Sequence, residues 1–326
     1  MSVWGYYAFL AGLTWWFKQA KERRREMRDR AALFLRTNVQ VKSILGAAAV
    51  VAILGISALR GVSDGKLHVT FLDVGQGDAI FIRTPSGRQV LIDGGPSDTA
   101  LLSQLGRRMP FWDRSIVLVL LTHPESDHVA GLIAVLERYR VDTVIFRQME
   151  MDSATYERWL EAVEIEGATV YEGKAGLHLA LDPGLEMVVL HPGAGLADGA
   201  NNNSVVTRLT YEEISLLLPG DIEAEVEANL VGAQHGAPQL QSTVLKVPHH
   251  GSCSSTTQAF LDAVDPEIAV ISVGADNRFG HPCDEVLERL GSLPVYRTDE
   301  QGAIEIVSDG TQMRVEVERE PSSDDG

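Results

Sequence analysis

The segment that most restricts what this chain can fold into is a short polar turn directly after an apolar strand. Residues 116–121 (IVLVLL) are typical of a buried strand, and the chain then continues THPESDH. His123, Glu125, Asp127 and His128 can face one point from so short a turn, because each residue advances the chain by only about 3.3 Å. Nitrogen and oxygen donors of this kind bind divalent metals. A single His beside an Asp is most simply a solvated turn, but the complete H-x-E-x-D-H pattern predicts a metal site.

Polar residues follow four other apolar strands in the same way. They are Asp93, the NNNS segment with Asn201, Asn202 and Ser204, Asp221, and the His249-His250 pair. Each cluster alone is compatible with a structural turn. Binding and catalytic residues gather on loops at strand ends, so the five clusters together predict one functional site.

From residue 67 onward, short apolar runs alternate with amphipathic segments. The expected strands cover residues 68–74, 79–83, 89–92, 116–121, 141–146, 168–171, 177–181, 186–190, 204–211, 214–218, 245–247, 268–273, 295–297, 303–307 and 313–317. The expected helices cover residues 98–109, 132–139, 153–166, 224–231, 256–263 and 285–290. This order predicts an α/β (α+β) domain in which two sheets pack face to face, with helices on the outside.

The start of the chain is typical of a membrane-associated region. Residues 44–59 carry no charge, which predicts a transmembrane helix at about residues 43–60, although the usual span is about 20 residues. The aromatic residues within 3–17 suit a membrane interface. The basic segment 18–42 is expected on the cytoplasmic side, which places the chain from about residue 61 outside the cytoplasm. A signal peptide is the alternative, but its basic region would be far too long here.

Charge is distributed unevenly, and this bears on the substrate. Residues 1–60 hold ten Lys/Arg against three acidic residues, whereas the remaining 266 residues hold 18 against 42, a net charge of −24. Proteins bind nucleic acids largely by neutralising phosphates with Lys and Arg, so this composition argues against a general nucleic-acid binder. A local basic groove would change that conclusion, and its candidate residues are Arg83, Arg88, Lys246 and Arg278.

The chain has two cysteines, Cys253 and Cys283, and they do not form a C-x-x-C motif. Two cysteines do not make up a disulfide framework. We interpret them as free thiols near the site, with a single bridge as the alternative.

The polar clusters also carry a family resemblance. The motifs LIDGG, THPESDHVAGL, NNNSVV, LLLPGD, LKVPHHGS and GHP resemble those of the metallo-β-lactamase superfamily, and within it the extracytoplasmic domain of ComEC-type DNA-uptake channels. The resemblance covers about residues 66–308 and implies a four-layer αββα sandwich with metals at one edge of the sheets. We therefore divide the chain into a membrane-associated region (1–61), a hydrolase domain (62–318) and a disordered acidic tail (319–326).

The resemblance implies a site for two divalent ions, Zn²⁺ or Mn²⁺, with Mg²⁺ as a further option. His123 and Glu125 match ligands of the first ion. Asp127 and His128 match ligands of the second ion. Asp221 matches a carboxylate that bridges both.

The His249-His250 pair supplies one further ligand, and the resemblance does not tell which ring binds. Two ions suit phosphodiester hydrolysis, because they neutralise charge on the attacked and leaving oxygens. The implied catalytic residues are Asp127, which orients the hydroxide nucleophile, and His281, which contacts a phosphate or acts as a general acid.

Two positions depart from the commonest pattern of the superfamily. Glu125 stands where a His is commonest and where this branch often has an Asp, and an oxygen donor there shifts the metal preference toward Mn²⁺ or Mg²⁺. Asn201 stands where many of these hydrolases have a His, and an amide oxygen is a weak ligand. The further candidate ligands are His191, Asn202, Ser204 and Asp93.

These observations predict a membrane-anchored, extracytoplasmic hydrolase of phosphodiesters that acts on DNA during uptake. The implied partners are DNA, the cytoplasmic membrane and a polytopic DNA-uptake channel subunit encoded separately. The acidic body keeps a second hypothesis open, the hydrolysis of a small ester or phosphodiester. A third hypothesis is a catalytically silent scaffold, or a fragment of a longer uptake channel.

Overall fold

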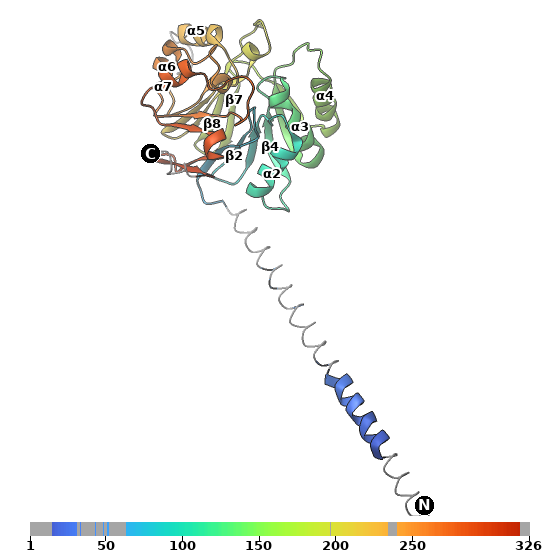
Figure 1. The fold of residues 1–326 in the computed structure, drawn as a ribbon. Helices are drawn as coiled ribbons and strands as arrows, with labels where there is room; N and C mark the ends of the chain where they lie inside the picture. The colour runs from blue at the N-terminus through green and yellow to red at the C-terminus, as the bar shows by residue number, and fades with distance from the viewer. Residues whose placement is uncertain are drawn as a thin grey trace, which may run out of the picture. The chain divides into compact units, whose positions relative to one another are not determined.

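The computed structural model describes residues 15–30, 33, 43, 48, 51, 63–195, 197–233 and 240–319. The chain divides into two units, residues 1–59 and 60–326 (Figure 1). In the first unit, residues 15–30 are helical. No helix within the described ranges is long and apolar enough to cross a membrane. Most of the predicted transmembrane helix at about 43–60 lies outside the described residues, as does the predicted tail beyond Arg319.

Two mixed sheets make up the second unit. In the part of the chain that is described, the first sheet has eight strands. They are, in spatial order, β15 (Met313–Val317), β14 (Ile304–Ser308), β1 (Leu67–Phe71), β2 (Ile80–Arg83), β3 (Gln89–Ile92), β4 (Ser115–Leu120), β5 (Arg140–Phe146) and β6 (Thr169–Glu172). The second sheet has seven strands. They are β13 (Val295–Arg297), β12 (Ile268–Ile271), β11 (Val244–Lys246), β10 (Ile214–Leu218), β9 (Val206–Tyr211), β8 (Leu185–His191) and β7 (His178–Asp182).

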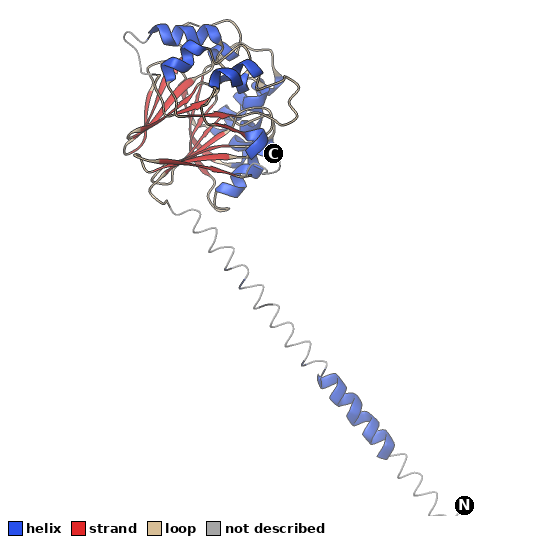
Figure 2. Ribbon diagram, turned by 60° about the vertical axis from the view of Figure 1, so that its left-hand side comes forward, coloured by secondary structure: helices blue, strands red, loops and turns tan. Residues whose placement is uncertain are grey.

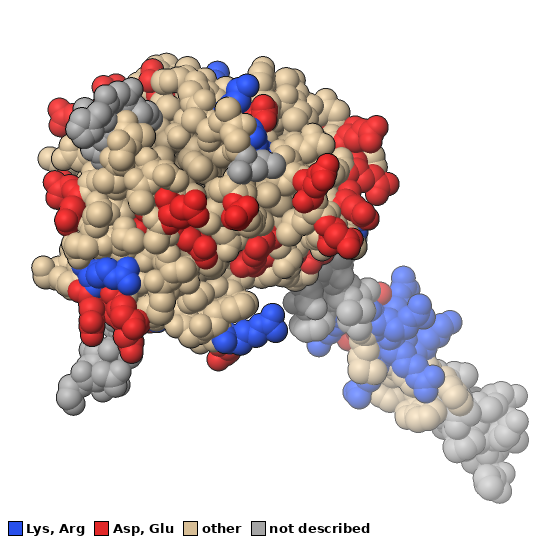
Figure 3. Space-filling view, turned by 90° about the horizontal axis from the view of Figure 1, so that it is seen from above, with Lys and Arg blue, Asp and Glu red and all other residues tan. Residues whose placement is uncertain are grey.

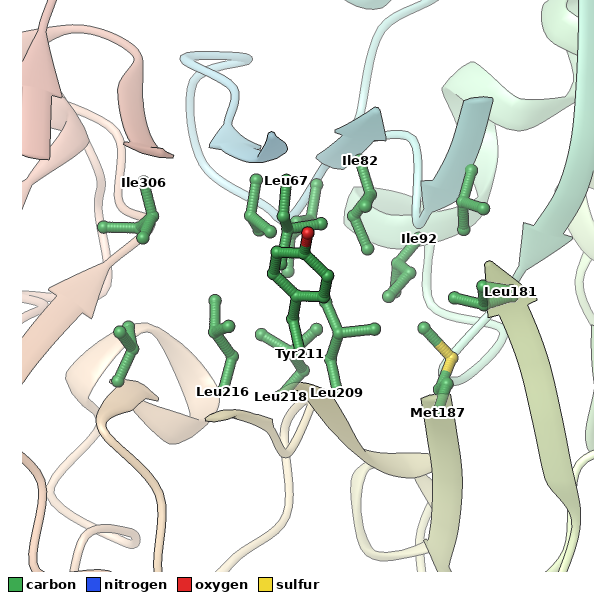
Figure 4. Packing of buried hydrophobic residues seen from close by; sticks show 14 of the residues in the cluster. Leu67, Ile82, Ile92, Leu181, Met187, Leu209, Tyr211, Leu216, Leu218 and Ile306 are labelled. Atoms are coloured by element: carbon green, nitrogen blue, oxygen red, sulfur yellow. The ribbon is translucent and has the colours of Figure 1, made fainter. Parts of the chain in front are cut away.

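The main core lies between the two sheets. Alternate residues of each strand face it, because successive side chains of a strand point to opposite faces of the sheet. Figure 4 shows Leu67 and Ile82 of the first sheet facing Leu209 and Leu216 of the second. Burying each such side chain contributes about 1.5–3 kcal/mol. The face-to-face packing expected from the sequence is therefore present.

Helices cover the outer faces of both sheets (Figure 2). The first sheet packs against α2 (Asp98–Arg108), α3 (Ser126–Arg138) and α4 (Ala154–Glu166), and their apolar residues form a second buried cluster. The second sheet packs against α5 (Ala224–Gly232), α6 (Gln258–Val264) and α7 (Asp284–Leu290), which form a third. The prediction of a mixed α/β fold with two sheets and outer helices is confirmed. The short elements η1 (Asn201–Asn203), η3 (Pro248–Gly251) and α8 (Thr298–Gln301) were not expected.

Helix α3 begins six residues earlier than the sequence predicted, at Ser126 instead of residue 132. The predicted helix started just after Gly131. In the structure Gly131 lies inside α3, where a Cβ atom would come within 2.1 Å of the Gly94 carbonyl oxygen. Glycine is therefore needed for close backbone packing of α3 against the loop after β3. The second half of the polar turn forms the first turn of this helix.

The two cysteines form a disulfide, which corrects the interpretation as free thiols. The bridge joins Cys253, just after η3, to Cys283, just before α7. Their Cα atoms lie 5.5 Å apart, because the Cys283 N–H donates to the Gly251 carbonyl and holds the two segments together. Closing a loop of this size contributes about 3–4 kcal/mol to stability.

Candidate metal centre

The centre lies where four strands end. Asp93 follows β3 and His123 follows β4 in the first sheet, while Asp221 follows β10 and His250 follows β11 in the second. Strands β3 and β4 are parallel, and so are β10 and β11, so each pair delivers its polar residues to one edge. The five clusters singled out in the sequence meet there.

Three buried imidazoles face two carboxylates. His128 Nε2 lies 3.3 Å and His250 Nε2 3.1 Å from Asp221 Oδ2. Asp127 Oδ2 lies 3.5 Å from His250 Nε2. The ring centroids of His123 and His128 are 4.1 Å apart. These side chains come from both sheets, so the centre closes only in the complete fold.

The donor set fits divalent metal ions. Among the described residues, the buried Nε2 atoms of His123, His128 and His250 have no aligned hydrogen-bond partner. Buried polar atoms are nearly always satisfied, so three such nitrogens around carboxylates point to a missing cation. Two overlapping groups have donor atoms within 4.8 Å of one another, and they share His128. They are His123, His128 and Asp221, and Asp127, His128 and His250.

Asp93 orients His128 through a hydrogen bond on the side of its ring away from the donor nitrogen. Its carboxylate accepts hydrogen bonds from the Thr122 N–H (2.8 Å), the Thr122 hydroxyl (2.7 Å) and His128 Nδ1 (2.8 Å). His250 Nδ1 donates in the same way to the Ser272 carbonyl (2.9 Å). A proton held on Nδ1 leaves Nε2 free to bind a metal. Asp93 was a candidate ligand in the sequence, and the geometry favours a positioning role instead.

We expect Asp93→Ala to weaken metal binding about 10- to 100-fold without abolishing it, as with other residues that orient a ligand. Competition with a chelator would measure the dissociation constant. Asp113→Ala is the matched control. Asp113 also accepts hydrogen bonds, from Ser115 and Gln89, but it precedes β4, whereas the centre follows this strand. Complete loss of binding in Asp93→Ala would instead make Asp93 a ligand.

The imidazoles differ in protonation before any metal binds. Burial, followed by the charge of His128, lowers the pKa of His123 to about 3, so its ring is uncharged and has a nitrogen lone pair for a metal ion. Burial also disfavours the charged form of His128, but Asp221 and Asp93 outweigh it and raise the pKa of His128. Binding of a metal by His128 must therefore displace a proton.

Asp78 was not predicted as a member of the centre, and Lys246 was considered only as a candidate for a basic groove. Lys246 is fully buried, and its Nζ forms an ion pair with Asp78 and lies 3.4 Å from Asp221 Oδ1. Burial raises the pKa of Asp78, but Lys246 and His250 outweigh it and hold that pKa well below its ordinary value. Lys246, a candidate residue for a basic groove, is therefore not available to a surface groove. A lone Lys inside the apolar run VLKV was the available signal, since Lys is rarely buried unless it is paired.

The two adjacent histidines have different roles. His250 joins the buried groups, whereas His249 is partly exposed and contacts the Asn201 amide through its Nε2 (3.3 Å). Both residues have positive φ, 50° and 54°, and this tight turn separates the two rings. Of the predicted pair, His250 is the ligand that the geometry supports.

Other predicted residues support the centre without joining the donor groups. Ser204 Oγ accepts from the Asp221 N–H (3.1 Å), and Asn202 Oδ1 accepts from the Glu223 N–H (3.0 Å). His191 Nε2 contacts the Asn202 carbonyl (2.8 Å). Glu125 precedes α3 and lies outside these groups, although it lines the same cavity.

A cavity of about 510 Å³ opens over the centre. Asp127 and Asp221 form its floor, and Glu125, His249, Asp276, Arg278, Phe279 and His281 are among its lining residues. Among the described lining residues, Arg278 is the one Lys or Arg. Arg83, Arg88 and Lys246, the other candidates for a basic groove, do not line it.

The fold and this centre define a metal-binding hydrolase class. The chain belongs to the metallo-beta-lactamase superfamily, whose family model matches residues 72–275. It is 32% identical over 261 residues to ComE operon protein 3 of Bacillus subtilis, covering 74% of this chain and 33% of that protein. It is 28% identical over 270 residues to competence protein ComA of Neisseria gonorrhoeae, covering 79% of this chain and 35% of that protein. The chain thus spans about a third of the length of these relatives.

Similarity to solved structures is more distant. A structure of the CmlA beta-hydroxylase matches with a TM-score of 0.49 and 12% identity, covering 74% of this chain and 53% of that one. The sequence resemblance to the superfamily and to competence proteins is confirmed.

Proposed function

We propose that this chain is a membrane-anchored, extracytoplasmic metallohydrolase that cleaves single-stranded DNA during uptake. The observation that carries the proposal is the cluster of three buried imidazoles with Asp127 and Asp221 at the base of an open cavity. Two adjacent metal ions suit in-line displacement at a phosphodiester. The similarity to competence proteins supports DNA as the substrate class.

The chain's own residues divide the work. Asp127, His128 and His250 would hold one ion, and His123 and Asp221 would provide donors for the second. His128 serves a single ion, because its Nδ1 is bound to Asp93 and only Nε2 is free. Bound divalent ions supply charge neutralisation at the phosphoryl oxygens.

Two cavity-lining residues can act on the substrate directly. The carboxyl of Asp127 is 27% exposed, so it can accept a hydrogen bond from an attacking water. Burial, followed by the charges of His249 and His250, lowers the pKa of His281. A neutral His281 ring can donate its N–H to a phosphate oxygen.

The disulfide supports the proposed location. Disulfides persist in oxidising compartments and are rare in the cytoplasm, and Cys253–Cys283 lies beside the centre. The uncharged segment 44–59 with basic residues before it supports a membrane anchor whose following domain lies outside the cytoplasm.

The acidic surface favours a small contact area with the substrate. Acidic side chains are spread over the face seen in Figure 3, whereas Lys and Arg are few on it. Such a surface would repel the phosphates of a nucleic acid that lay along it. The same observation, with the moderate cavity volume, favours hydrolysis of a small ester or phosphodiester as the second candidate function.

A metal-titrated cleavage assay tests the proposal. The full chain in detergent would be stripped with a chelator and reloaded with Mn²⁺, Zn²⁺ or Mg²⁺. We expect metal-dependent cleavage of end-labelled single-stranded DNA, with RNA and small esters tested in parallel. Cleavage of the esters alone would select the second candidate. A protein that binds metal but cleaves neither phosphodiesters nor esters would refute both, and fewer than one metal per chain would favour a scaffold.

A further inference from the structure

An exposed aromatic ring stands at the mouth of the cavity. Phe279 is 57% exposed and lines the cavity above the centre. Its ring is nearly parallel to that of His281, with centroids 5.8 Å apart and an interplanar angle of 14°. The Arg278 guanidinium carbon lies 5.3 Å from the Phe279 centroid. A cation, an aromatic ring and an imidazole are thus assembled on one segment.

The segment that carries Phe279 is held in place by hydrogen bonds. The Asn277 amide donates to the Gly274 carbonyl (2.9 Å) and the His281 carbonyl (2.7 Å), and its oxygen accepts from the His281 N–H (3.0 Å). The Gly274 N–H donates to the Gln76 side chain (3.1 Å). The exposure of Phe279 therefore belongs to a braced loop and not to a fraying one.

Exposure alone does not identify a site, because single exposed apolar residues are normal. Phe111 shows this, since it is 59% exposed and packs edge-on against Trp112 after the end of α2, away from the strand ends that carry the donors. Phe279 differs in its surroundings. It borders the cavity over the centre, and its neighbour Arg278 is the one Lys or Arg among the described residues that line this cavity.

We propose that Phe279 and Arg278 form a nucleobase-stacking subsite. One unstacked base lies on the exposed part of the Phe279 ring, and Arg278 contacts the adjacent phosphate. This inference rests on the proposed function and narrows it to nucleic acids with an unpaired base. Stacking on aromatic side chains tolerates any base sequence. Because it needs few cations, it allows an acidic protein to hold single-stranded DNA.

Binding without cleavage tests the subsite. The probe is a fluorescent oligodeoxythymidine measured by anisotropy with the full chain in excess chelator, and a companion oligomer carries abasic sugars. We expect Phe279→Ala to weaken binding of the oligodeoxythymidine about 5- to 100-fold, and Phe279→Trp to retain it. The losses of binding free energy caused by Phe279→Ala and by the abasic oligomer should not add up, because both changes remove the same contact.

Phe111→Ala is the matched control, because it removes the same side chain at similar exposure. Equal binding by Phe279→Ala and the unmodified chain overturns the inference. So does an equal loss on the abasic oligomer, or no binding of oligodeoxythymidine by the unmodified chain. The cleavage assay remains a separate readout: ring-dependent binding without any metal-dependent cleavage would refute the proposed function but keep the subsite.

Discussion

Replacing Asp127 with alanine is expected to lower metal-dependent cleavage of single-stranded DNA by more than about 10³-fold, the scale of losing a catalytic side chain. Asp127 is the donor carboxylate that is both partly exposed to the cavity and within 3.5 Å of His250 Nε2. Its removal takes away a metal ligand and the group that orients the attacking water. Because the side chain is not buried in the core, the fold should persist.

The matched control for this prediction is Asp98→Ala. Asp98 is also an acidic residue in the first turn of a helix on the first sheet, α2 instead of α3. Each substitution removes a similar helix-end stabilisation, about 0.3–1 kcal/mol. Turnover and thermal unfolding would be measured on both variants. If Asp127→Ala kept a tenth of the activity, the assignment of this centre would be wrong. If that residual activity did not depend on metal, the proposed function would be wrong as well.

Lys246→Met is expected to destabilise the metal-free protein by about 3–5 kcal/mol. Removing one partner of a buried ion pair leaves the other charge unpaired, and that is the cost reported for such changes. Here Asp78 and Asp221 would both lose their buried cation. Urea unfolding in excess chelator gives the free energy of unfolding.

Two comparisons sharpen this result. The double variant Lys246→Met with Asp78→Asn should be more stable than Lys246→Met alone, because one of the unpaired charges is gone. Lys174→Met removes a lysine whose partner Glu172 is on the surface, and should change stability by no more than about 0.5 kcal/mol. A Lys246→Met variant within about 1 kcal/mol of the unmodified chain would contradict the buried-pair argument.

The fold was largely readable from local pattern. Strands β3, β13 and β15 have the predicted bounds, because apolar runs bounded by turn residues are local signals. The start of α3 was missed because the conformation of Gly131 depends on a contact with Gly94, which no local pattern contains. The pairing of Cys253 with Cys283 was missed for the same kind of reason.

The sequence predicted which types of residue make up the candidate centre, but not how they are arranged. His249 and His250 are chemically identical neighbours, and only the backbone turn separates their rings. Lys246 was a candidate for a basic groove because its partners Asp78 and Asp221 are distant in sequence, so nothing local marks the charge as paired. Roles that depend on which atom faces which required the structure.

The glycines around the polar turn have a consequence for how this centre can change during evolution. A Cβ at Gly77 would lie 2.1 Å from the Asp127 carbonyl oxygen, as one at Gly131 would from that of Gly94. Main-chain contacts therefore fix the path of the turn on two sides, whatever side chains it carries. The cavity-lining side chain at residue 125 can then be exchanged without moving His123 or His128. The lining of the cavity can therefore change by single substitutions while the scaffold is inherited unchanged.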